Sequence, residues 1–394
     1  MTISRRQFVK NGLITGTCLA GGLHKLFAAG EIDDFIKGIM NSRHISGIAA
    51  CSVKNNKINW SGGYGWADID KKIPMSPENT VQNIGSISKT ITATAVMQLW
   101  EKKKFKLDDN VNDFLPFKVE NPKFPGQKIT FRQLLTHRSS IKDGPSYDES
   151  YACGDPAISL KTWLKEYFTP DGKFYNEKEN FHMWQPGEKG KIPAQPRAYS
   201  NVAFGLLGYL AEVISGVPFD VYCQKYIFEP LNMNHTSWYL SGLDTTKHAV
   251  PYTFISAGKT GSVLTKDGLI EKKVDKDSFV PNCLYSFPNY PDGLIRTSVH
   301  QLARFLLAYM QKGSYKGAQI LKKETVATML SKEHFGRGLC WFNYDYKNNT
   351  AWGHGGGDPG VSTMMLFRPT DKTGVIIFSN TGGARLNEIV KKLL

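Results

Sequence analysis

The feature that most restricts the fold of this chain is the position of its sheet-like segments, which lie near both ends of the sequence. Residues 46–70, SGIAACSVKNNKINWSGGYGWADID, read as two strands around an Asn-Asn-Lys turn, followed by a third short apolar piece. Residues 361–368, VSTMMLFR, and 375–380, VIIFSN, read as a strand pair joined by the turn PTDKTG. Strands at both ends with helices between them predict one antiparallel sheet built from both ends of the chain.

Helical patterns begin at Ser86 and dominate to about residue 240. Thr130 and Ser159 are expected to cap two helices, and a long apolar helix is expected to end at Gly216. Further helices are expected at 218–231, 298–311 and 386–394.

These segments predict an α/β (α+β) domain over residues 31–394, with helices flanking the sheet. The sheet lobe is expected to comprise about 31–85 and 285–394, with a mainly helical lobe, about 86–284, inserted between the two parts. Clefts form at such seams. Residues 142–197 are the longest irregular region and are rich in aromatic side chains, so they read equally well as a lid or pocket wall and as surface decoration.

The first 30 residues differ in character from the rest. The basic stretch SRRQFVK is followed by a weakly apolar segment, NGLITGTCLAGGL, and by small residues. Arg5, Arg6, Phe8 and Lys10 fit a twin-arginine export signal, so we expect cleavage near residues 28–30 and a periplasmic protein. A lipoprotein anchored through Cys18 is the weaker alternative, because ITGT is a poor lipobox. No run approaches the ~20 apolar residues of a membrane span.

The charge is basic but dispersed. The formal net charge of +14 becomes +10 once the four positive charges of residues 1–30 are removed. Lysines are interleaved with acids, as in EKKKFKLDD, which favours a solvated surface over a nucleic-acid stripe and leaves attraction to an anionic envelope polymer as an option.

Five cysteines remain after residue 30, at widely spaced positions and without a C-x-x-C pair. Neither a zinc site nor a full disulfide framework is indicated. We expect mostly buried free thiols at Cys51, Cys153, Cys223, Cys283 and Cys340.

Ser86 and Lys89 lie three positions apart at the start of an apolar helix, so their side chains share one face. The same Ser-x-x-Lys spacing occurs at Ser139 and Ser256, where the surrounding sequence is polar and loop-like. A helix N-terminus offers free N–H groups and a positive potential, which favour an oxyanion and disfavour a protonated lysine. We therefore expect a lowered pKa for Lys89, leaving a neutral amine that takes the proton of a nucleophilic Ser86.

The segment SISK and its flanks, residues 63–116, resemble the serine hydrolases related to class C β-lactamases, low-molecular-weight DD-peptidases and family VIII esterases. The resemblance spans most of residues 35–390 and includes FRQLLTHRSS, the YSN motif with its helix, IFEPLNM, PDGLIRTSVHQLARF and GHGGGDPG. It implies a sheet with an inserted helical lobe, an acyl-enzyme mechanism, and no metal or other cofactor.

The second motif of that family is tyrosine, any residue, asparagine. It occurs at Tyr199 to Asn201, before a long apolar helix as the family has it, and at Tyr346 to Asn348, which reads as a hairpin turn. The resemblance implies that Tyr199 passes a proton to the leaving group. It implies that Asn201 holds a substrate carbonyl or orients the lysine. Without the resemblance, the motif reads as a helix cap.

The third motif is Lys-Thr-Gly in most β-lactamases. Its two copies here, at 259–261 and 372–374, fall in a flexible-looking stretch and in the last hairpin turn, so both read as decoys. The family position is occupied instead by His354, Gly355 and Gly356, similar to the His-x-Gly variant of DD-peptidases and esterases. His354 is expected to bind a substrate carboxylate or ester, although near neutral pH it is mostly uncharged. The N–H groups of Gly357 and Ser86 are expected to form the oxyanion hole.

The resemblance thus implies an exported serine hydrolase acting on esters or D-amino-acid-type peptides, such as an esterase or DD-carboxypeptidase. The alternatives are a class C-like β-lactamase and a non-catalytic penicillin- or peptidoglycan-binding sensor. An α/β-hydrolase lipase is excluded because no G-x-S-x-G occurs, and a zinc hydrolase lacks its histidine motif. Residues 355–360 match G-x-G-x-x-G, but a strand follows them and they contain Pro359, so no dinucleotide-binding helix begins there. The expected partners are a small ester, peptide or β-lactam and, as an option, cell-wall peptide. Oligomeric state stays open.

Overall fold

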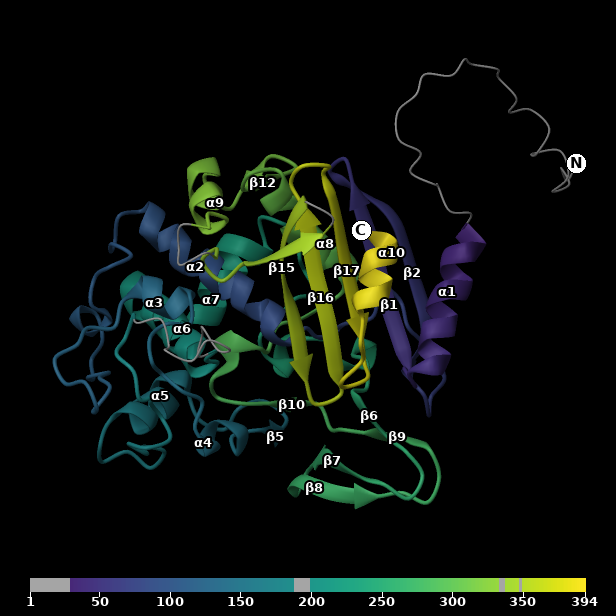
Figure 1. Ribbon diagram of the computed structural model, residues 1–394, viewed down its shortest axis with the longest axis horizontal. Helices are drawn as coiled ribbons and strands as arrows, with labels where there is room; N and C mark the ends of the chain where they lie inside the picture. Colours follow the sequence, from purple (N-terminus) through teal and green to yellow (C-terminus); the bar gives the residue numbers. More distant parts are fainter. Residues whose placement is uncertain (1–28, 188–198, 333–336, 347–348) are drawn as a thin grey trace, which may run out of the picture.

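The structure is a computed structural model that describes residues 29–187, 199–332, 337–346 and 349–394 (Figure 1). The expected signal peptide, residues 1–30, lies outside this part apart from its last two positions, and so does the turn centred on 347–348. Within the described ranges, no single helix is long and apolar enough to cross a membrane. One bent pair, Val202–Ser215 with Phe219–Phe228, passes that test by length and composition when taken together.

One large antiparallel sheet organises the molecule and is formed by both ends of the chain (Figure 1). Within the described residues its strand order is β14-β15-β16-β17-β1-β2-β3. The strands are β1 (Gly47–Lys54), β2 (Lys57–Asp68), β3 (Ile73–Pro74), β14 (Phe342–Tyr346), β15 (Asn349–Asp358), β16 (Val361–Arg368) and β17 (Thr373–Ser379). The central pairing joins the two ends, since Ile48 of β1 lies opposite Ser379 of β17. The predicted fold class is confirmed.

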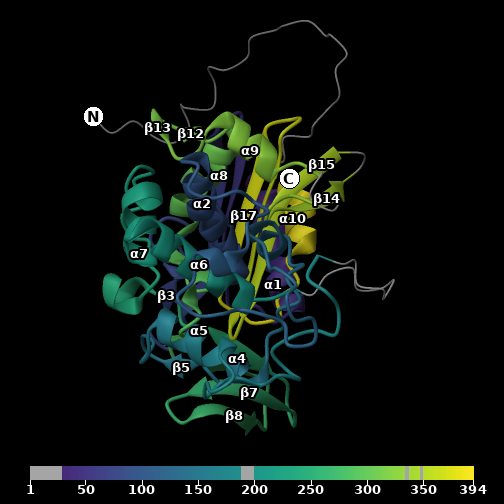
Figure 2. The ribbon, with the colours of Figure 1, turned by 90° about the vertical axis from the view of Figure 1, so that its left-hand side faces the viewer.

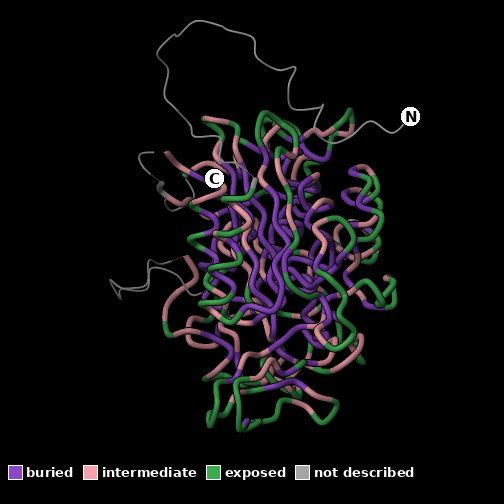
Figure 3. Tube along the Cα trace, turned by 90° about the vertical axis from the view of Figure 1, so that its right-hand side faces the viewer, coloured by how far each residue is buried: buried purple, intermediate pink, exposed green. Residues whose placement is uncertain are grey.

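The two faces of the sheet are covered by different helices, because alternate residues of each strand point to opposite sides. On one face, Ile48 and Ala50 pack with α1 (Ala29–Ser42) and α10 (Asn387–Leu393). On the other face, Ala49 and Cys51 join the large core that contains α8 (Val299–Met310). Figure 3 shows the sheet and the central helices as the buried centre of the molecule. Helix α1 was absent from the sequence-based predictions.

The remaining helices pack beside the sheet (Figure 2). They are α2 (Ser88–Glu101), α3 (Phe131–Leu135), α4 (Pro145–Asp148), α5 (Leu160–Phe168), α6 (Val202–Ser215), α7 (Phe219–Cys223) and α9 (Lys323–Met329). The predicted caps are confirmed: Thr130 and Ser159 accept backbone hydrogen bonds at the starts of α3 and α5, and Gly216 ends α6 with a φ of +71°. The helix expected at 218–231 begins as α7 and continues as a π-helical turn, Gln224–Phe228.

Short two-stranded pairs lie outside the large sheet. They are β4 (Gln82–Asn83) with β11 (Arg296–Thr297), β5 (Ala152–Cys153) with β10 (Tyr285–Ser286), β6 (Tyr252–Ile255) with β9 (Ser278–Pro281), β7 (Thr260–Thr265) with β8 (Gly268–Lys273), and β12 (Ser314–Tyr315) with β13 (Ala318–Gln319). The Lys-Thr-Gly copy at 259–261 therefore opens a regular hairpin, β7–β8, rather than a flexible stretch.

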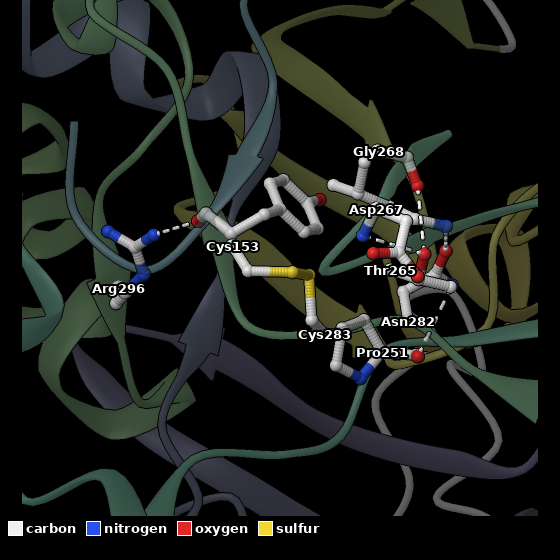
Figure 4. The surroundings of a disulfide bond; sticks show 10 residues. Cys153, Pro251, Thr265, Asp267, Gly268, Asn282, Cys283 and Arg296 are labelled. Atoms are coloured by element: carbon white, nitrogen blue, oxygen red, sulfur yellow. Dashed lines mark hydrogen bonds between the residues drawn. A yellow bond between two sulfur atoms is a disulfide. The ribbon is translucent and has the colours of Figure 1, made fainter. Parts of the chain in front are cut away.

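A disulfide bond joins Cys153 to Cys283 (Figure 4). The expectation of buried free thiols is confirmed for Cys51, Cys223 and Cys340, but it is wrong for this pair. The two cysteines are 130 positions apart in the sequence, and the pairing of β5 with β10 brings them together. Because that pairing is a tertiary contact, spacing along the chain does not reveal it.

Candidate active site

Ser86 lies in a 3₁₀ turn, η1 (Gly85–Ile87), immediately before α2. The turn requires glycine at position 85, where φ is +53° and an added β-carbon would lie 3.0 Å from the Gly357 nitrogen. The Gly85 N–H donates to Asn83 Oδ1 at 2.7 Å. The nucleophile loop is thus fixed at its base, while Ser86 itself stays partly exposed.

Helix α2 is buried along nearly its whole length. Two hydrogen bonds anchor it to residues 291–295. Thr92 Oγ1 donates to the Pro291 carbonyl at 2.6 Å, and Ser88 Oγ accepts from the Ile295 N–H at 3.0 Å. These two bonds hold residues 291–295 against the face of α2 that carries Lys89.

Lys89 has a fully buried side chain, and its Nζ makes three hydrogen bonds. It donates to Ser86 Oγ at 2.9 Å, to Asn201 Oδ1 at 2.6 Å and to the Asp292 carbonyl at 2.9 Å. Three acceptors match the three donors of an ammonium group. The structure therefore brings Ser86 and Lys89 together across one helical turn, as their spacing predicted.

The prediction of a lowered pKa for Lys89 is wrong. Burial alone lowers the pKa of this amine, but its interactions with Tyr199 and with the carboxylates of Asp292 and Asp143 raise it, and the balance lies above the ordinary value. The sequence argument considered only the helix N-terminus and the apolar neighbours. Tyr199, Asp292 and Asp143 all come from other parts of the chain. This direction favours the ammonium form of Lys89 in the resting site.

Asn201 is oriented by Asp143 rather than by the helix that it precedes. Its Nδ2 donates to Asp143 Oδ2 at 2.9 Å, so its Oδ1 faces Lys89. The same carboxylate accepts the backbone N–H groups of Asn201 and Val202 and caps α6 from a distant loop. Of the two roles expected for Asn201, this geometry favours orienting the lysine.

Tyr199 lies beside the Ser86–Lys89 pair. Lys89 Nζ is 5.0 Å from the centroid of its ring. Burial raises the pKa of Tyr199, and the charge of Lys89 and hydrogen bonds with Ser86 and Lys89 oppose this effect without cancelling it. The ring stacks on His137 with centroids 4.2 Å apart, and His137 Nδ1 accepts the Ser200 N–H at 3.2 Å. The phenol is therefore protonated near neutral pH and held in place.

Strand β15 forms the opposite wall of the site. A β-carbon on Gly356 would lie 2.1 Å from the Ile84 carbonyl oxygen, so glycine is needed for β15 to pass this close to the nucleophile loop. His354 is 2% exposed, and its Nδ1 donates to the Gly355 carbonyl at 2.6 Å. A neutral His354 ring consequently presents Nε2 as an acceptor, and donation to a substrate carboxylate requires the protonated ring.

A cavity of about 510 Å³ opens onto Ser86. Among the described residues its lining includes Ser86, Tyr199, Arg337, Phe342, Asn343, Tyr344, His354, Gly355 and Gly357. Ser86, the Tyr199 phenol and Gly357, the expected oxyanion donor, thus share one open space. Gly356 and Asn201 lie behind this surface, where they shape the wall and hold Lys89.

Within the described ranges, no group of three or more His, Cys, Asp or Glu side chains is arranged to hold a metal ion. The chemistry of the site is carried by a hydroxyl, an ammonium, a phenol and an imidazole around one cavity.

The family model described as Beta-lactamase matches residues 32–391. The chain belongs to the beta-lactamase family. Protein flp of Staphylococcus aureus is 22% identical over 365 residues, which cover 92% of this chain and 65% of the relative. This beta-lactamase-family chain therefore spans about two thirds of the length of the staphylococcal proteins that it matches.

Two solved structures share the fold of this beta-lactamase-family chain. The octameric penicillin-binding protein homologue from Pyrococcus abyssi is 25% identical, with a TM-score of 0.69 over 92% of this chain and 76% of that one. The D-amino acid amidase from Ochrobactrum anthropi SV3, complexed with D-phenylalanine, is 19% identical, with a TM-score of 0.67 over 92% and 98%. Hydrolases are thus among the proteins that share this fold.

Several residues of the site escaped the sequence analysis: Asp143, Tyr147, His137, Asp292 and Arg337. Asp292 left a signal, because a carboxylate in the largely apolar segment NYPDGLI is unusual unless it has a buried partner. Asp143 left none, since it lies in a polar loop.

Proposed function

We propose that this chain is an exported hydrolase that forms an acyl-enzyme through Ser86 and acts on esters or on D-amino-acid peptides and amides. The observation that carries the proposal is the 2.9 Å hydrogen bond between Lys89 Nζ and Ser86 Oγ at the mouth of an open cavity. A serine with a hydrogen-bonded amine and a neighbouring phenol is the arrangement of an activated nucleophile.

Acylation begins when the Lys89–Tyr199 pair has lost one proton. Because the two groups are coupled, the loss belongs to the pair rather than to one member. Ser86 Oγ then attacks the carbonyl carbon, and the pair takes the hydroxyl proton. The resulting oxyanion lies against the N–H groups of Ser86 and Gly357, each such donor contributing about 3 kcal/mol of transition-state stabilisation.

Collapse of the tetrahedral intermediate breaks the bond to the leaving group, which takes a proton from the Tyr199 hydroxyl. A water molecule then attacks the acyl-serine ester. The same pair accepts the proton of the water and returns one to Ser86 Oγ, so the acid is released and the site is restored.

Three observations support ester or D-amino-acid substrates over β-lactams. His354 stands where most β-lactamases have the lysine of Lys-Thr-Gly, and its single Nδ1–H is already committed to Gly355. The cation that lines the cavity is instead Arg337, whose guanidinium lies 5.7 Å from the centre of the Phe342 ring. The amidase with the similar fold was solved with D-phenylalanine bound.

The experiment that tests the proposal is intact-mass measurement after incubation with penicillin, with Ser86→Ala as the control. A long-lived adduct that is absent from the variant would identify Ser86 as the nucleophile and favour a penicillin-binding DD-peptidase. Rapid release of penicilloic acid would instead identify a β-lactamase. With penicillin left intact, p-nitrophenyl acetate and D-phenylalanine amide are the next substrates. A wild type that neither labels with nor turns over any of the three would refute the hydrolase assignment in favour of a binding protein.

The export part of the proposal rests on the twin-arginine pattern of residues 5–10. Replacing Arg5 and Arg6 together by lysine is expected to leave the protein in the cytoplasm. Cell fractionation of the two forms measures this, and periplasmic recovery of the double variant would refute the route.

A further inference from the structure

Asp292 faces Lys89 with both its backbone and its side chain. The Asp292 carbonyl accepts from Lys89 Nζ at 2.9 Å, and its carboxylate Oδ1 lies 3.8 Å from the same nitrogen. The two side chains are 0% and 2% exposed. A buried ion pair is therefore built directly behind the nucleophile, on the side away from the cavity.

The Asp292 carboxylate is held in this position from two sides. The Tyr147 hydroxyl, from α4, donates to Oδ1 at 3.2 Å, and Asn289 Nδ2 donates to Oδ2 at 2.5 Å. Asn289 Nδ2 also donates to the Asn201 carbonyl at 3.0 Å, which ties the carboxylate to the start of α6. Residues from three separate segments thus fix the distance between carboxylate and amine.

Other titratable groups surround Lys89 at longer range. Tyr199 faces it from the start of α6, Asp143 and Tyr147 come from the 142–148 loop and helix, Asp358 follows from β15, and Cys340 precedes β14. Burial raises the pKa of the Cys340 thiol, so it stays neutral. Within the described residues, Asp292 is the carboxylate recorded at ion-pair distance from Lys89.

A carboxylate at this distance stabilises the ammonium form of Lys89 over the amine. The proposed acylation step requires the Lys89–Tyr199 pair to lose one proton. Burial raises the pKa of Asp292 to about 7, so its carboxylate carries a negative charge above that pH. This charge opposes the proton loss whichever of the two groups gives the proton up, because both changes remove positive charge from its vicinity.

We propose that Asp292 is a positioning residue that holds Lys89 in its three-donor arrangement and sets the pH above which the Ser86–Lys89–Tyr199 group becomes active. This inference rests on the proposed function, since it concerns the proton acceptor of the same step. It adds a determinant of the working pH that lies outside the cavity and touches no substrate.

The test is the pH dependence of kcat/KM for p-nitrophenyl acetate, between about pH 7 and 11, in the wild type and in Asp292→Asn. Asparagine keeps the backbone carbonyl and can still accept from Tyr147, but it removes the charge. We expect the acid limb of Asp292→Asn to move down by about one pH unit or more, so that kcat/KM at a given pH on that limb rises about tenfold.

Two controls separate charge from packing. Asp292→Glu, which keeps the charge, is expected to restore an acid limb close to that of the wild type, and Asp275→Asn, at an exposed acid far from the site, is expected to change nothing. An Asp292→Asn protein that unfolds at the wild-type temperature but has an unmoved acid limb, or one moved upward, would overturn the proposal.

A second measurement needs no variant at position 292. In protein labelled with ¹³C at lysine Cε, the Lys89 resonance is identified by its absence in Lys89→Arg and followed as the pH is raised. Titration above the ordinary range of lysine is expected, and a midpoint near or below neutral pH would overturn the proposal. The hydrolase assignment is tested separately by Ser86→Ala with penicillin or esters. A failure of that assignment can therefore be told apart from a failure of the role proposed for Asp292.

Discussion

The same Ser-x-x-Lys pattern occurs at Ser86–Lys89 and at Ser139–Lys142, and the structure gives the two pairs opposite surroundings. At the first, the lysine is fully buried and donates to the serine hydroxyl at 2.9 Å. At the second, Lys142 is 36% exposed and pairs with Glu179 across the surface, while Ser139 Oγ accepts the Ile141 N–H.

What separates the two pairs is the number of distant residues that converge on the lysine. Asn201 and Asp292 bind Lys89 from segments more than a hundred positions away in the sequence. Among the described residues, the Lys142 ammonium pairs with Glu179, and a solvated ion pair of that kind contributes at most ~1 kcal/mol. A spacing motif therefore becomes a candidate catalytic pair only where the fold removes the lysine from water and supplies its acceptors.

The largest difference in activity between the two Ser-x-x-Lys pairs is expected when their serines are replaced. Ser86→Ala is expected to lower kcat/KM for p-nitrophenyl acetate by roughly 10⁴-fold or more, because it removes the nucleophile. Ser139→Ala is expected to stay within a few-fold of the wild type. Steady-state kinetics on both variants measure this, and comparable losses in the two would mean that Ser86 is not the nucleophile.

The two lysines give the next largest contrast. Lys89→Ala is expected to slow acylation by about 10²–10⁴-fold, the range of a missing general base. Lys142→Ala is expected to leave the rate unchanged and to alter stability by less than about 1 kcal/mol. Single-turnover acylation is the measurement. An unchanged rate in Lys89→Ala would remove Lys89 from the mechanism.

The smallest effect is expected for the residue that orients Asn201. Asp143→Ala removes the carboxylate that caps α6 and holds the Asn201 amide. We expect a loss of about 2 kcal/mol in the free energy of unfolding and a several-fold lower kcat with KM little changed. Asp148→Ala, at the exposed end of α4, is the matched control. Equal stability of the two variants would show that the Asp143 bonds contribute little.

The sequence predicted the parts of this molecule that depend on local patterns. Alternation in residues 46–70 and 361–380 indicated the strands, and Thr130, Ser159 and Gly216 marked helix ends, because caps act through neighbouring residues. The resemblance added Tyr199, Asn201 and His354, all of which lie around Ser86 in the structure or hold its lysine.

The missed parts depend on contacts between distant segments. The pKa shift of Lys89 was predicted in the wrong direction because Tyr199, Asp292 and Asp143 reach it only in the folded chain. The disulfide was missed for the same reason, since β5 and β10 must pair before Cys153 meets Cys283. Helix α1 covers a sheet face that only the completed sheet creates.

The pairing of β1 with β17 has a consequence for how this protein folds during its synthesis. Ile48 leaves the ribosome early, yet its partner Ser379 is among the last residues to be made. Contacts so distant in the chain close slowly, because their ends must find one another before any of the pairing is gained. When the ribosome has added Ser86 and Lys89, the nascent chain still lacks β15, the strand that carries His354 and Gly357. The proposed site is therefore complete only after β15 has been made, late in synthesis.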